Sequence, residues 1–130
     1  MYPAELMQHA PYQQLVDAVV ADIYKEKPEL YDRFGDKGVE RCREDNYFHL
    51  QYLTTSYQLK SASIFLDYTA WLNEVLTSRG IDSGHIVQNY RLLIEHIPKT
   101  ITDFNEQHFF ITCLKKAIAQ LDPGGDFYSQ

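Results

Sequence analysis

Hydrophobic residues recur every three or four positions over most of the chain, which is the periodicity of helices that bury one face. Prolines and glycines interrupt the pattern, and residues 39–79 contain neither. The pattern predicts six helices: Pro11–Glu26, Pro28–Phe34, Val39–Gln58, Ser61–Arg79, one from Asp82 or Ser83 to Pro98, and one from Thr102 or Asp103 to Leu121. No alternating strand pattern competes. We therefore expect a single all-α domain over residues 1–130, with loose tails at 1–10 and 122–130.

Each of the longer predicted helices has a stripe that we expect to be buried. These stripes are Leu15, Val16, Val19, Val20 and Ile23; Val39, Cys42, Asn46, Leu50, Leu53 and Tyr57; Ile64, Phe65, Tyr68, Trp71, Leu72, Val75 and Leu76; Ile86, Val87, Tyr90, Leu93, Ile94 and Ile97; and Phe104, His108, Ile111, Leu114, Ala117, Ile118 and Leu121. Phe109 and Phe110 are adjacent and cannot both point inward. At least one of them should meet another helix or a partner.

Charge and composition narrow the classes of function. The chain has 12 Lys and Arg against 18 Asp and Glu, a net charge of −6, which argues against nucleic-acid binding. It also has 10 Tyr, 7 Phe and 1 Trp, an unusually large aromatic content. Several of these aromatic residues fall in the predicted hairpin 39–79, where most should be core and the surplus could meet a flat ligand or a partner.

Cysteine use and the N-terminal sequence indicate a cytoplasmic protein. Cys42 and Cys113 are too few for a disulfide framework and lack the C-x-x-C spacing of zinc or redox sites. The first residues do not have the pattern of a signal peptide, and no apolar run is long enough to span a membrane.

Common catalytic and cofactor motifs are absent from the sequence. Of the five histidines, His49 and His108 fall on or beside apolar stripes, where a buried ring bonded to a neighbour is the simpler interpretation and a ligand role the alternative. His85 and His96 are expected to be exposed near helix ends. Residues 59–84 contain no histidine, which argues against a haem with a proximal histidine.

The run Arg41-Cys42-Arg43-Glu44-Asp45 concentrates charge and a thiol in just over one helical turn. Cys42 and Asp45 are neighbours on one helix surface, and His49 follows four residues later. One interpretation is a groove lined by these groups. The other is an exposed charge cluster beside a small buried thiol.

The segment from Cys42 to Thr54 resembles the chromophore helix of the phycobiliproteins, which are globin-fold light-harvesting subunits. In that family the cysteine forms a thioether to an open-chain tetrapyrrole, an arginine pairs with a propionate, and an aspartate accepts hydrogen bonds from pyrrole N–H groups. Cys42, Asp45 and Leu50 match this pattern. The arginine is displaced by one place to Arg43, and Glu44 takes the position of the family's arginine.

Residues 41–80 also resemble the cofactor-less globin-like domains of bacterial sensor proteins, including those that precede cobalamin-binding modules. The resemblance rests on Cys-Arg-Glu-Asp at 42–45, Tyr47, His49-Leu50 and Asp67-Tyr68-Thr69-Ala70-Trp71-Leu72. Within that group the chain is similar to cyanobacterial and algal globin-like proteins associated with bilin biosynthesis. The resemblance implies an all-α, globin-like (phycobiliprotein-like) fold, no haem, no obligatory cofactor, and a role in phycobilin or phycobilisome metabolism that supports photosynthesis.

Three functions follow from these expectations. The first is a non-enzymatic regulatory or interaction protein that forms a homodimer through its last two helices and binds a phycobilisome or bilin-pathway protein. The second is a bilin-binding or carrier protein whose groove consists of Cys42, Arg43, Asp45, His49, Tyr68 and Trp71. The third, an enzyme such as a bilin lyase, is disfavoured because Cys42 and His49 are about two helical turns apart.

Overall fold

The computed structural model describes residues 3–124, which contain helices and no strand. The α-helices are α1 (Ala10–Glu26), α2 (Glu29–Gln58), α3 (Ala62–Ser78), α4 (Ser83–Thr100) and α5 (Phe104–Leu121). A short 3-10 helix, Leu6–Gln8, precedes them. The all-α class predicted from the periodicity is therefore confirmed.

The structure has five α-helices in the described range, one fewer than the six predicted, because the second and third predicted helices are joined in α2. They meet at Gly35, whose backbone angles (φ 63°, ψ −155°) are not helical. A side chain is strongly disfavoured in this region of the Ramachandran map, so glycine permits a sharp kink. The predicted break at Gly35 is thus a kink within one element.

Side-chain caps decide between the alternative helix starts. The carboxylates of Asp82 and Asp103 accept hydrogen bonds from the amides of Gly84 and Glu106, so aspartate caps both α4 and α5. Ser61 precedes α3 but makes no cap, because its hydroxyl bonds that of Ser63 instead.

The predicted end of the fourth long helix at Pro98 is wrong by two residues, since α4 continues to Thr100. Proline removes one amide donor, but the last turn still closes through the amide of Ile101, which donates to the carbonyl of Ile97 at 2.9 Å. A proline this close to the end of a helix therefore need not stop it.

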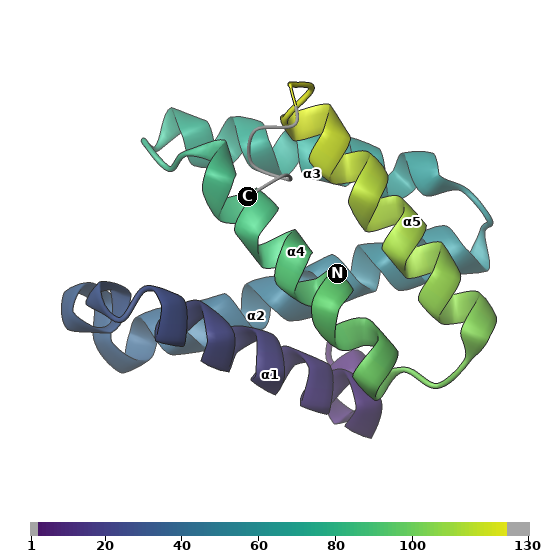
Figure 1. Cartoon of the computed structure of the whole chain (residues 1–130), viewed down its shortest axis with the longest axis horizontal. Helices are drawn as coiled ribbons and strands as arrows, with labels where there is room; N and C mark the ends of the chain where they lie inside the picture. The colour runs from purple at the N-terminus through teal and green to yellow at the C-terminus, as the bar shows by residue number, and fades with distance from the viewer. Residues whose placement is uncertain (1–2, 125–130) are drawn as a thin grey trace.

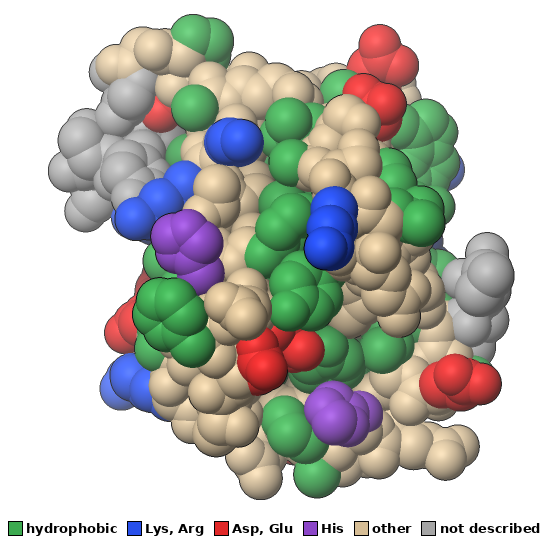
Figure 2. Space-filling view, turned by 90° about the vertical axis from the view of Figure 1, so that its right-hand side faces the viewer, with side chains coloured by type: hydrophobic (Ala, Val, Ile, Leu, Met, Phe, Trp, Pro, Cys, Tyr) green, Lys and Arg blue, Asp and Glu red, His purple; other side chains and the backbone are tan. Residues whose placement is uncertain are grey.

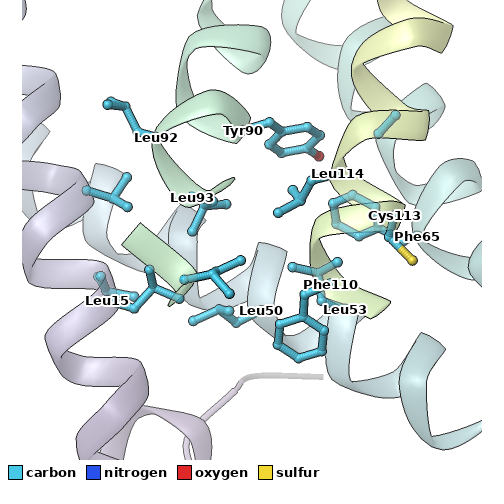
Figure 3. Packing of buried hydrophobic residues seen from close by; sticks show 14 of the residues in the cluster. Leu15, Leu50, Leu53, Phe65, Tyr90, Leu92, Leu93, Phe110, Cys113 and Leu114 are labelled. Atoms are coloured by element: carbon cyan, nitrogen blue, oxygen red, sulfur yellow. The ribbon is translucent and has the colours of Figure 1, made fainter. Parts of the chain in front are cut away.

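Helix α4 lies at the centre of the fold and packs against α1, α3 and α5 (Figure 1). Figure 3 shows how its side chains Tyr90 and Leu93 meet Leu114 of α5 and residues of the other helices. All five helices contribute to this single buried cluster. Tyr90, Phe65 and Phe110 are its largest fully buried side chains.

The helical stripes predict much of this core correctly, with three errors. Trp71 (58% exposed), Phe104 (74% exposed) and His108 lie on the surface, although each falls on a predicted buried stripe. A stripe drawn from spacing alone marks a wider helix face than the one that packs, and Phe104 is also the first residue of α5. Phe110 is buried, and the ring of Phe109 lies 5.4 Å from that of Tyr57 on α2, so the pair meets other helices as expected.

The N-terminal tail is more ordered than expected. The 3-10 helix packs against α1 and α2, and Leu6 and Met7 contact the core. Of the predicted C-terminal tail, residues 125–130 lie outside the described range. In the part of the chain from residue 3 to 124, no helix combines the length and the apolar character needed to cross a membrane.

Candidate functional site

Residues at the end of the bundle where α1 turns into α2 and α3 turns into α4 line a pocket of about 460 Å³. These two turns lie on the left of Figure 1. The pocket is bounded by the end of α1, by residues 30–49 of α2, by residues 68–76 of α3 and by the start of α4. The lining residues are Ile23, Tyr24, Leu30, Phe34, Lys37, Gly38, Arg41, Cys42, Asp45, His49, Tyr68, Leu72, Leu76, Ile81, His85, Ile86, Gln88 and Asn89. Four helices thus converge on one concave site.

Most of the wall is aliphatic or aromatic, and a few polar groups are set into it. Leu30 and Phe34 of α2 and Leu72 and Leu76 of α3 belong to this apolar part of the wall. Apolar pockets with a small number of converging polar groups are typical of small-molecule sites. Volume and composition therefore favour a ligand with an extended apolar body.

The thiol of Cys42 lies in the wall and is only partly exposed. Burial, and then the nearby carboxylate of Asp45, raises its pKa to about 11, although the cation of Arg43 acts in the opposite direction. The group is therefore a neutral thiol at physiological pH, and its nucleophilicity is low.

The carboxylate of Asp45 is the acidic group of the pocket. Its Oδ1 lies 3.4 Å from Nε of Arg41, one helical turn earlier, and its side chain remains 52% exposed. Partial burial raises the pKa of Asp45 to about 6, and Arg41 opposes this shift. A ligand with N–H groups that donate to Asp45 would favour the ionised form.

His49 and Tyr68 form the back wall of the pocket. The Nδ1 atom of His49 is hydrogen-bonded to the hydroxyl of Tyr68 at 2.8 Å, and the ring of Tyr68 stacks on that of Tyr52 at 4.1 Å. Burial lowers the pKa of His49 to about 3, so its ring is neutral. The simpler interpretation, a buried histidine bonded to a neighbour, therefore describes His49; His108 instead stacks on Phe104 at the surface.

A pair of buried amides supports the wall from behind. Asn46 and Asn89 exchange two hydrogen bonds, at 3.1 and 2.7 Å, and Asn46 also donates to the carbonyl of Cys42. Both side chains are nearly or fully buried. This reciprocal pair joins α2 to α4.

Four of the six residues predicted for the groove, Cys42, Asp45, His49 and Tyr68, line the pocket. The other two do not. Arg43 turns away and forms an ion pair with Asp17 of α1, and Trp71 is exposed with its ring 6.3 Å from that of Tyr68. Each of the two interpretations therefore holds for part of the run. Cys42 and Asp45 line a pocket, while Arg43 belongs to the surface.

Sequence reasoning missed two cations and an amide at the site, Lys37, Arg41 and Asn89. A signal for the cations was available, because residues 37, 41 and 45 recur every four positions and must share one helix face. Asn89 gave no signal, since its partner Asn46 is distant in sequence and only the fold brings them together.

His96, expected to be exposed, is only 15% exposed, and its Nε2 lies 2.6 Å from Oδ2 of Asp22 on α1. Tertiary packing of α4 on α1 covers the ring, which the position near a helix end did not reveal. With Glu95, these residues bring three potential metal ligands together. The contact with Asp22 accounts for His96 without an ion. His85 is exposed as expected.

Comparisons of the chain with protein-family models, curated proteins and solved structures found no match. The geometry of the pocket and the sequence resemblance are therefore the basis for a functional proposal.

Proposed function

We propose that this protein is a non-enzymatic regulator with a globin-like fold that binds a bilin, an open-chain tetrapyrrole, reversibly in the pocket. The observation that carries the proposal is the convergence of Cys42, Asp45, His49 and Tyr68 on one largely apolar pocket. The resemblance of residues 41–80 to globin-like proteins of bilin metabolism names the ligand class and a role in phycobilin or phycobilisome metabolism.

The pocket offers complementary groups for each part of such a ligand. Its volume of about 460 Å³ falls within the usual range for small-molecule sites. The apolar wall suits conjugated rings, and the carboxylate of Asp45 can accept from pyrrole N–H groups. Lys37 and Arg41, both on the pocket side of α2, supply cations for the propionates.

The chemistry of Cys42 favours reversible binding over covalent attachment. Thioether formation requires a nucleophilic thiolate, and a thiol with a pKa near 11 is almost entirely protonated at neutral pH. The ring of His49, bonded to Tyr68, is held in the back wall as a structural group. This arrangement supports a binding protein more than a lyase.

A biliverdin titration followed by visible absorption tests the proposal. We expect a shifted spectrum, colour that stays with the protein through gel filtration, and release of all colour on denaturation. Asp45→Asn should weaken binding, whereas Asp67→Asn, at an exposed position on α3, should not. An unshifted spectrum with no protein-bound colour would contradict bilin binding, and colour retained after denaturation would contradict its reversible form.

A protein-interaction function is the second candidate, because aromatic side chains are exposed away from the pocket. Phe104 at the start of α5 is 74% exposed, and Figure 2 shows hydrophobic side chains among charged groups on the face that includes this end of the bundle. A homodimer through α4 and α5 would cover Phe104. Solution scattering at micromolar concentration tests this function: a dimer that Phe104→Glu dissociates supports it, and a monomer removes it.

A further inference from the structure

Residues 28–34, the N-cap and first turns of α2, carry two side chains that line the pocket, and we call this segment the flap. Leu30 and Phe34 of the flap line the pocket, yet Phe34 is 52% exposed and Tyr31 is 48% exposed. No residue of the flap is buried. Leu30 is half-buried and packs against the core, and the other flap residues are exposed, so few contacts hold the flap.

The backbone at Gly35 sets the direction of the flap. Its angles, φ 63° and ψ −155°, lie in a region that is nearly restricted to glycine. A Cβ at this position would meet no atom within 4 Å. Glycine is therefore required here for its backbone freedom and not for close packing.

Two contacts join the flap to the part of α2 that follows the kink. The hydroxyl of Tyr31 donates to Oδ1 of Asp36 at 2.8 Å, on the other side of Gly35. A Cβ at Gly38 would lie 2.5 Å from Cβ of Phe34, so the flap approaches the next turn of α2 closely only because residue 38 is glycine. The exposed hydrogen bond is weak, and the approach of Phe34 to Gly38 adds no bond, so both contacts can break and form again at low cost.

We propose that the flap is a gate that rotates about Gly35 to admit a ligand to the pocket, closing with Leu30 and Phe34 against it. The identity of the ligand rests on the proposed function, but the gate does not. Its movement can be measured without any ligand, because Cys42 lies in the pocket beneath the flap and Cys113 is fully buried in the core.

The test is the rate at which Cys42 of the unliganded protein reacts with a thiol reagent, with the modified residue identified by mass spectrometry. Gly35→Ala and Gly38→Ala should each raise the rate about fivefold or more, the first by backbone strain and the second by displacing Phe34. Tyr31→Phe, a change at an exposed site, should raise it about twofold.

Phe104→Ala is the control, because Phe104 is 74% exposed at the start of α5 and does not line the pocket. Its Cys42 rate should stay at that of the unmodified chain. Rates for Gly35→Ala, Gly38→Ala and Tyr31→Phe that equal the control would overturn the gate. If a glycine variant fails to fold, Tyr31→Phe decides alone. Failure of biliverdin to bind would contradict the proposed function. It would not affect the test of the gate, because the thiol rates are measured without a ligand.

Discussion

The centre of the bundle and the end where α1 turns into α2 are built in opposite ways. In α4, seven of the eight residues from Ile86 to Leu93 are buried, and they pack against α1, α3 and α5. Between Tyr24 and Asp45, where α1 turns into α2, no residue is buried. The first region holds the fold together by close packing, while the second leaves apolar surface open around a pocket.

This difference indicates that stability and ligand binding depend on different parts of this small domain. Asn46 and His49 are positioned without help from the flap, because their partners, Asn89 and Tyr68, lie in α4 and α3. The open region can then move or accept a ligand at little cost to the fold. Stability and binding should therefore respond to different substitutions.

The largest expected contrast is between a core residue and a flap residue. Phe110→Ala, at a fully buried position, should lower the free energy of unfolding by about 3–5 kcal/mol, because it removes contacts and leaves a cavity. Leu30→Ala, at a half-buried position in the flap, should cost about 1 kcal/mol or less. Urea unfolding followed by circular dichroism measures both changes. Equal losses would contradict the difference between the packed core and the flap.

The buried amide pair should show a smaller effect with a distinctive pattern. Asn46→Ala should cost about 1–3 kcal/mol, because it leaves the amide of Asn89 without its partner. Replacing both residues with leucine should cost less than the sum of the single leucine changes, since no polar group is then stranded. A double-mutant cycle in urea checks this, and additive losses would mean that the two amides act independently.

Acidification should change the contributions of His49 and Asp45 to stability in opposite directions. His49 has a folded pKa of about 3 against an ordinary 6.5, so the unfolded chain takes up the proton first and stability falls as pH drops from 6.5 toward 3. Asp45 has a folded pKa of about 6 against 3.8, so the folded chain takes up the proton first and stability is gained as pH drops through 6.

Asp45→Asn removes this opposing contribution. The variant should therefore lose more stability than the unmodified chain between pH 7 and 4, by up to about 1 kcal/mol, as expected for a half-exposed group. Urea midpoints across this pH range provide the measurement. A variant that resists acid better than the unmodified chain would reverse the assignment.

The smallest expected effect on stability concerns Arg43, which should differ from Arg41 in its effect on binding. Arg43→Ala breaks a surface pair with Asp17 and should cost less than about 1 kcal/mol, with no change in biliverdin affinity. Arg41→Ala, in the pocket wall, should weaken biliverdin binding up to about fivefold. Absorption titrations of the two variants check this. A larger loss of biliverdin affinity for Arg43→Ala than for Arg41→Ala would favour the groove predicted from the sequence, which included Arg43.

Much of the fold is readable from the sequence because hydrophobic spacing reports which helix face is buried. Leu15, Leu50 and Phe65 are fully buried as the stripes predict. The kink at Gly35 is harder to read, since a glycine in a polar segment can end a helix or bend it, and only the path of the flap decides.

The site is less readable, because spacing places side chains on a helix face but does not say what that face meets. Cys42 and Asp45 share a face, and the fold places a pocket in front of it. Arg43, one position away from Cys42, points about 100° around the helix and meets α1 instead. Tertiary partners such as Asp17 have no signature in the local sequence.

Hydrogen exchange with and without biliverdin tests most directly whether the open end of the bundle is the binding end. We expect slower exchange on binding in residues 23–45 and 72–89, which surround the pocket, and no change in residues 104–121 of α5. Slowing confined to α5, or no slowing at the pocket in a sample that demonstrably holds biliverdin, would contradict the account.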